Sequence, residues 1–100
     1  MNVNVNPVHF TADQKLVEFV NKKVVKLDQY FDGIISADVL MKVDKPESPK
    51  NKVVELKLSI PSRDYLFAEK HADSFEEALD LAVDAVKKQL GKFKEKLKTK

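Results

Sequence analysis

The 100 residues, 43% of them hydrophobic, suffice for one domain with a core closed over a sheet, and they leave no room for a second domain. The absence of cysteine excludes disulfides, thiolate metal sites and thiol nucleophiles, and it favours an intracellular protein. The sequence lacks a signal-peptide pattern and an apolar run of membrane-spanning length. We therefore expect a single soluble, cytoplasmic domain over residues 1–100.

The charges are distributed unevenly along the chain. The net charge is +2, but residues 87–100 contain seven lysines against the single Glu95, so this segment carries +6 and the remainder about −4. Such asymmetry indicates a polyanionic partner, either nucleic acid or an anionic membrane. The alternative is a solvated, lysine-rich helix end, because cations also favour helix C-termini.

The N-terminal third predicts a strand and then a helix. Val3 and Val5 alternate with asparagines, and Pro7 ends the alternation. Thr11 and Gln14 have capping-box spacing, which predicts a helix from there to about Phe31. That helix would carry an apolar stripe of Leu16, Val20, Val24, Leu27 and Phe31, and beside it a basic stripe of Lys15, Lys22 and Lys26, with Lys23 between the two.

Three strand-like runs follow Gly33, which suits the end of the first helix. They cover about residues 35–43, 52–60 and 65–70, and the first two show period-two alternation of apolar and polar residues. The connecting segments, 44–51 and 61–64, have turn chemistry suited to antiparallel hairpins. We expect a meander with one buried and one wet face.

A second helix is predicted from Ser74, which forms a capping box with Glu77, nearly to the C-terminus. Its first turns are acidic and its later turns basic, and Gly91 alone weakens the helical pattern. One side should pack on the sheet through Phe75, Leu79, Ala82, Val86, Leu90, Phe93 and Leu97. The elements together predict an α+β domain of order β-α-β-β-β-α, with both helices on one face of the sheet.

Catalytic patterns are scarce. His9 and His71 lack spaced carboxylate or cysteine partners, which argues against a metal site. Two glycines cannot build a phosphate-cradling loop, and the serines fit strand, turn and cap positions. Carboxylates such as Glu76 and Asp80 are explained by solvation on an acidic first turn. We expect that the protein is not an enzyme and that it binds no metal, no cofactor and no small-molecule substrate.

The lysine rows of the two helices suggest a clamp for a polyanion. Lysines act as point charges on phosphates, so binding should depend strongly on salt. Recognition of particular bases would need more than lysine side chains, and Arg63 is the one arginine. The aromatic residues mostly occupy positions that core packing explains: Phe19, Tyr30, Phe31, Tyr65, Phe67, Phe75 and Phe93. Recognition of backbone shape is therefore expected, as in modules that dock on structured RNA.

Three segments resemble the ribosome hibernation promoting factor and ribosome-associated inhibitor family. They are Lys26-Leu27-Asp28-Gln29-Tyr30-Phe31-Asp32, Ala72-Asp73-Ser74-Phe75-Glu76-Glu77-Ala78-Leu79-Asp80 and Lys88-Gln89-Leu90-Gly91-Lys92-Phe93-Lys94-Glu95-Lys96-Leu97. The order and spacing of the three carry the resemblance, which covers almost the whole chain.

The resemblance implies a four-stranded sheet with two helices on one face, similar to double-stranded-RNA-binding domains. It further implies binding to 16S ribosomal RNA between the head and body of the small ribosomal subunit, over the messenger and transfer RNA positions. Such a hibernation factor inhibits translation under stress or in stationary phase. The implied rRNA contacts are Lys22, Lys23, Lys26, Lys87, Lys88, Lys92 and Lys94, with Lys15, Lys96 and Lys98 as weaker candidates.

Two departures from the family pattern stand out. Asn6 and Pro7 replace a glycine that many relatives carry after the first strand. The chain also ends where long members continue into a dimerising domain, so it resembles the short class, whose ribosome pairing depends on a separate dimerising factor, or the inhibitor subclass, which opposes pairing.

Two other functions remain open from the sequence. One is a basic amphipathic helix that leaves the domain to bind an anionic membrane or a partner protein, as charge and amphipathicity permit. The other is an enzyme or regulator of unknown type that shares the fold, because fold does not determine function.

Overall fold

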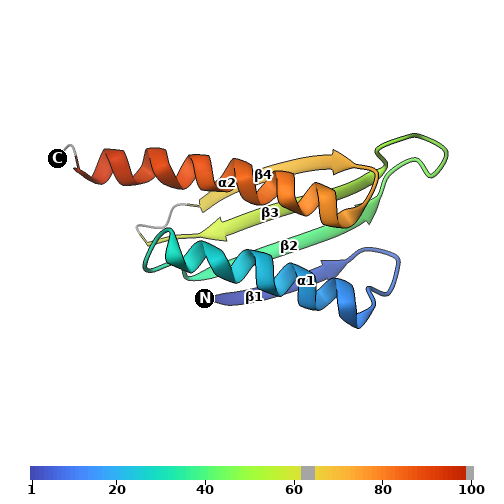
Figure 1. Cartoon of the computed structure of the whole chain (residues 1–100), viewed down its shortest axis with the longest axis horizontal. Coiled ribbons are helices and arrows are strands. Elements are labelled where there is room, and N and C mark those ends of the chain that lie inside the picture. The colour runs from blue at the N-terminus through green and yellow to red at the C-terminus, as the bar shows by residue number, and fades with distance from the viewer. Residues whose placement is uncertain (62–64, 99–100) are drawn as a thin grey trace.

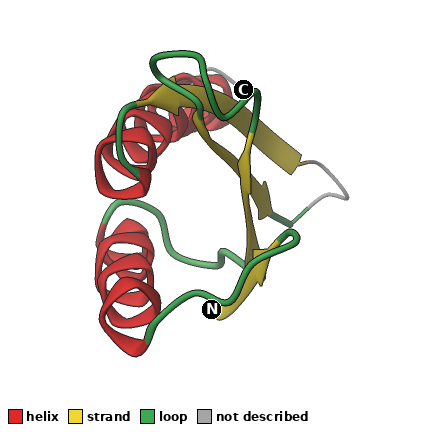
Figure 2. Cartoon of the chain, turned by 90° about the vertical axis from the view of Figure 1, so that its right-hand side faces the viewer, coloured by secondary structure: helices red, strands yellow, loops and turns green. Residues whose placement is uncertain are grey.

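The computed structural model describes residues 1–61 and 65–98, with side chains as far as Glu95. In chain order it contains β1 (Asn2–Pro7), α1 (Gln14–Val25), the 3-10 helix η1 (Lys26–Gln29), β2 (Ser36–Val43), β3 (Lys52–Ser59), β4 (Tyr65–Ala72) and α2 (Phe75–Lys98). A layer of two helices covers one face of the sheet (Figures 1 and 2). The predicted α+β class and element order are confirmed. Part of the expected hairpin connector, residues 62–64, lies outside the described residues.

The sheet has the order β1-β2-β3-β4. The last three strands form the predicted antiparallel meander, whereas β1 pairs in parallel with β2 because α1 forms the crossover between them. Pro7 belongs to β1 and does not end it early, since it is in register with Met41. The N–H of Val8 bonds the carbonyl of Met41, so the nitrogen of Pro7 faces the free edge, where a strand tolerates proline.

The core lies between the sheet and the helices. Its central row runs across all four strands through Val5, Val39, Leu56 and Ala68. The two apolar helix stripes cover this row, as predicted, with their fully buried members being Val20, Val24, Leu27, Leu79, Ala82, Val86 and Leu90. The predicted last member, Leu97, lies beyond the side chains that the structure describes.

The two helix starts differ in how well the sequence predicted them. Ser74 caps α2 as expected, with its Oγ accepting the N–H of Glu77 at 3.1 Å. The cap of α1 is Asp13 and not Thr11: the Asp13 carboxylate accepts the N–H of Leu16 at 2.8 Å. The prediction was wrong because Phe10, stacked on Phe75 with 5.1 Å between ring centroids, ties the preceding segment to α2.

The end of the first helix also differs from the prediction. The α-helix stops at Val25, and the chain continues as the tighter η1 to Gln29, followed by a turn. Gly33 adopts φ of 96°, a left-handed conformation that suits glycine. The tighter winding still keeps Leu27 fully buried, so the apolar stripe survives the change of helix type.

Candidate nucleic-acid interface

The two helices run in the same direction, and their lysine-rich second halves lie at the same end of the molecule (Figure 1). Lysines occupy the last turn of α1 and the second half of α2, which extends past the ends of β3 and β4 in the same view. The carbonyl ends of the helices are partially negative and favour cations there. The fold therefore collects two separate lysine segments into one basic region.

A groove runs between the helices in this region. Its first hollow, about 320 Å³, is lined by Lys23, Lys26, Asp80, Val83, Asp84 and Lys87. A second hollow, about 350 Å³, is lined by Tyr30, Asp84, Lys87, Lys88 and Gly91. Because Asp84 and Lys87 line both hollows, we treat them as one interhelical groove.

Contacts within the groove fix several of these cations. Lys23 Nζ lies 3.1 Å from Asp80 Oδ1, which joins α1 to α2. Lys87 Nζ and Lys94 Nζ lie 5.3 Å and 5.7 Å from the centroid of the Tyr30 ring. Cation–π contacts of this length orient ammonium groups at partly exposed sites, so Tyr30 gathers two lysines that lie about two turns apart on α2.

The predicted contact residues separate into three sets. Lys23, Lys26, Lys87 and Lys88 line the groove, and Lys94 reaches it over Tyr30. Lys22 and Lys92 are exposed but line neither hollow, and Lys15 is exposed on the first turn of α1. The weaker candidates Lys96 and Lys98 have side chains outside the described part of the structure.

The chain was compared with known proteins by sequence. Residues 3–98 match the family of the Sigma 54 modulation protein / S30EA ribosomal protein. This protein belongs to that family. The ribosome hibernation promoting factor of Pseudomonas putida is 33% identical over 96 residues, which cover 96% of this chain and 89% of the relative. That of Escherichia coli is 32% identical over 98 residues, covering 98% and 96%. The predicted relationship is confirmed.

Longer family members share this domain as part of their length. The ribosome hibernation promotion factor of Bacillus subtilis is 31% identical over 101 residues, which cover 100% of this chain and 52% of the relative. Among solved structures, the N-terminal domain of Thermus thermophilus Protein Y has a TM-score of 0.79 at 23% identity, covering 93% of this chain and 99% of that chain. A ribosomal subunit interface protein from Coxiella burnetii has a TM-score of 0.84 at 20% identity, covering 95% and 99%. Both structures share the fold.

In this family member, sequence reasoning assigned only lysines to the interface and missed Tyr30 and two carboxylates of the groove. Tyr30 was attributed to core packing, yet its exposed fraction is 46%. Its neighbour Phe31 takes the place in the core by packing edge-on against Phe93, with 5.4 Å between ring centroids. Asp80 was explained by solvation and Asp84 was not singled out, yet both line the groove and Asp80 pairs with Lys23. The sequence did contain a signal for Tyr30: it stands next to Phe31, and the more polar of two adjacent aromatic residues is the one expected to reach solvent.

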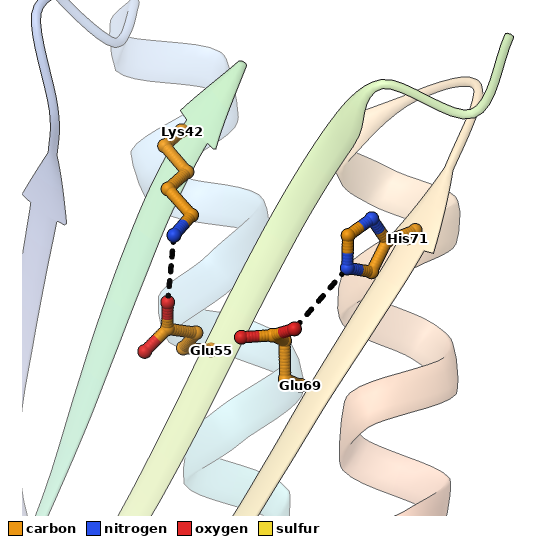
Figure 3. A network of polar contacts seen from close by, with 4 residues as sticks. All are labelled: Lys42, Glu55, Glu69 and His71. Carbon is orange, nitrogen blue, oxygen red and sulfur yellow. Dashed lines mark hydrogen bonds and ion pairs between the residues drawn. The ribbon is translucent and has the colours of Figure 1, made fainter. Parts of the chain in front are cut away.

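The opposite face of the sheet is electrostatically different. Figure 3 shows two polar contacts there, with the helices behind the sheet: the ion pair of Lys42 with Glu55 at 3.3 Å and the hydrogen bond between His71 and Glu69 at 3.2 Å. Tyr65 and Phe67 also lie on this side and are 61% and 43% exposed, which corrects their assignment to the core. The carboxylates of Glu55 and Glu69 on this face make it a poor polyanion site.

The alternative of a membrane-binding helix finds little support in the packing. The apolar side of α2 is covered by the sheet, and Leu79, Val86 and Leu90 are fully buried. Within the described ranges, 1–61 and 65–98, no helix is long and apolar enough to cross a membrane. The same residues contain no group of three or more histidines and carboxylates arranged to hold a metal ion.

Proposed function

We propose that this protein is a ribosome hibernation factor that binds the small ribosomal subunit through the interhelical groove. The observation that carries the proposal is the convergence of Lys23, Lys26 and Lys87 on one hollow, although they come from different helices. Family membership supplies the biological context, because the matching relatives are named ribosome hibernation factors. A ribosomal partner would make the cytoplasm its site of action.

The proposed ligand is the phosphate backbone of 16S ribosomal RNA between the head and body of the subunit. Ammonium groups neutralise phosphates and release counterions, which supplies affinity without reading sequence. The carboxylates of Asp80 and Asp84 repel phosphates at fixed points in the groove. Alternating charge of this kind would favour one placement of the RNA over others.

Inhibition would follow from occupancy and needs no chemical step. A domain seated in the channel between head and body would exclude messenger and transfer RNA and keep the ribosome idle. We therefore assign no catalytic role to any residue. The lysines proposed to contact rRNA are Lys22, Lys23, Lys26, Lys87, Lys88, Lys92 and Lys94.

Sedimentation tests the proposal directly. Purified protein is mixed with small subunits, large subunits or vesicles of phosphatidylserine and phosphatidylcholine, and each mixture is pelleted. We expect stoichiometric pelleting with small subunits and loss of that binding when messenger RNA and transfer RNA are bound first. Pelleting with vesicles and none with small subunits would refute the proposal. A structure of the complex on vacant ribosomes would then locate the contacts and show whether ribosomes pair.

A further inference from the structure

The Tyr30 end of the groove combines an exposed aromatic ring with cations. Tyr30 is 46% exposed, while Phe31 beside it packs against the core cluster. Lys87 and Lys88 line the same hollow, and Lys94 lies over the ring of Tyr30. Asp84 is the carboxylate among the residues that line this hollow, so cations outnumber anions there. A flat apolar surface beside several ammonium groups matches the chemistry of a nucleotide, which has a flat base and an anionic phosphate.

Gly91 is an independent indication at the same place. It lies inside the second half of α2 and lines the hollow, and a Cβ built on it would meet nothing within 4 Å. Glycine lowers helix stability relative to alanine, so the fold gains nothing from glycine here. A glycine that the packing does not require is expected where a ligand approaches the backbone closely.

We propose that Tyr30 and Gly91 form a subsite for one unpaired nucleotide of the bound RNA. The base lies against the Tyr30 ring, above the bare backbone at Gly91, and its phosphate is held by Lys87, Lys88 and Lys94. Cation–π contacts at exposed sites are weak, so the ammonium groups leave the ring for the phosphate when the nucleotide arrives. The inference rests on the proposed RNA-binding function and adds base stacking to what was expected to be recognition of backbone shape.

Substitution of the ring tests the subsite, with a matched control elsewhere on the molecule. Y30L removes the ring and keeps an apolar side chain, and Y30F keeps the ring. Tyr65 provides the control, because it is also an exposed tyrosine with a lysine over its ring, Lys57 at 4.7 Å, but lies on the opposite sheet face. Y65L therefore reports any general effect of losing an exposed ring.

The readouts are affinity for small subunits and chemical probing of the rRNA. We expect Y30L to bind about tenfold more weakly, within the range for losing one stacked base, and Y30F and Y65L to bind as the wild type does. Y30L should lose protection at one base while the backbone footprint from hydroxyl radicals persists. A purely structural role of Tyr30 would alter the whole footprint.

G91A supplies the second arm of the test. The substitution should raise the melting temperature, because alanine is the better helix former, and yet weaken binding to small subunits. Unchanged binding and unchanged base reactivities in both Y30L and G91A would overturn the subsite while leaving the proposed function intact. Failure of the wild type to bind small subunits at all would instead overturn the proposed function, and the subsite with it.

Discussion

Lys23 on α1 and Asp80 on α2 form an ion pair across the interhelical groove, with 3.1 Å between Nζ and Oδ1. The side chains are 38% and 52% exposed, so the pair contributes little to stability, about 0–1 kcal/mol. The pair also bears on the proposed binding, because it draws a groove lysine toward a carboxylate. A phosphate that binds there competes with Asp80 for Lys23.

Removal of the carboxylate should therefore strengthen binding. We expect D80N to increase the affinity for small subunits by roughly threefold and to change the unfolding free energy by less than about 1 kcal/mol. Titration of labelled protein with subunits and urea denaturation measure the two effects. The control is E47Q, which removes a carboxylate from the exposed segment between β2 and β3. Weaker binding of D80N would mean that this carboxylate assists the contact.

Charge reversal at two exposed lysines of α2 should abolish most binding. K88E with K92E places two negative charges where phosphates are proposed to lie, and we expect affinity for small subunits to fall by at least about tenfold. Helical content, measured by circular dichroism, should not change, because both side chains are exposed.

A control with the same change in net charge separates position from total charge. Lys45 and Lys50 are exposed in the segment between β2 and β3, at the opposite end of the molecule from the C-terminus of α2 (Figure 1). K45E with K50E should retain affinity within about twofold, apart from weak long-range electrostatics. Equal losses in the two double variants would contradict a localised site.

Salt dependence counts the phosphates that the protein contacts. The logarithm of the binding constant should fall linearly with the logarithm of salt concentration, and K87A should reduce that slope by about 1 if Lys87 neutralises one phosphate. K45A should leave the slope as it is. Fluorescence titrations between low and moderate salt give both slopes. A flat response in the wild type would exclude phosphate contacts as the main source of affinity.

The two candidate caps of α1 can be distinguished by stability. D13A removes the carboxylate that accepts the Leu16 N–H, and we expect a loss of about 1 kcal/mol in the free energy of unfolding. T11A should cost little, although Thr11 has the capping-box spacing, because Thr11 lies outside the helix. Urea denaturation of both variants decides the matter: a larger loss for T11A would refute the assignment of Asp13.

Much of the fold could be predicted because the periodicity of apolar residues along the sequence indicates which positions are buried. The positions of Val20, Val24 and Leu27 follow the helical repeat, and Val54, Leu56 and Leu58 follow the strand repeat, and all six are fully buried. The bounds of α1 were harder to predict. Asp13 replaces Thr11 as the cap, and η1 replaces the last α-helical turns. The chain before α1 contacts α2 through Phe10 and the chain after η1 contacts it through Phe31, so tertiary contacts help to set where the helix begins and ends.

The sequence by itself determined the two lysine segments, the apolar stripe of each helix and the relationship to the family. It could not determine that both helices would point the same way, which follows from the parallel pairing of β1 with β2 and the meander after it. Only the tertiary structure brought Lys23 to Asp80 and placed Lys87 and Lys94 over Tyr30. Helical periodicity assigns a residue to a face of its own helix, whereas a groove depends on two helices packed side by side on one sheet.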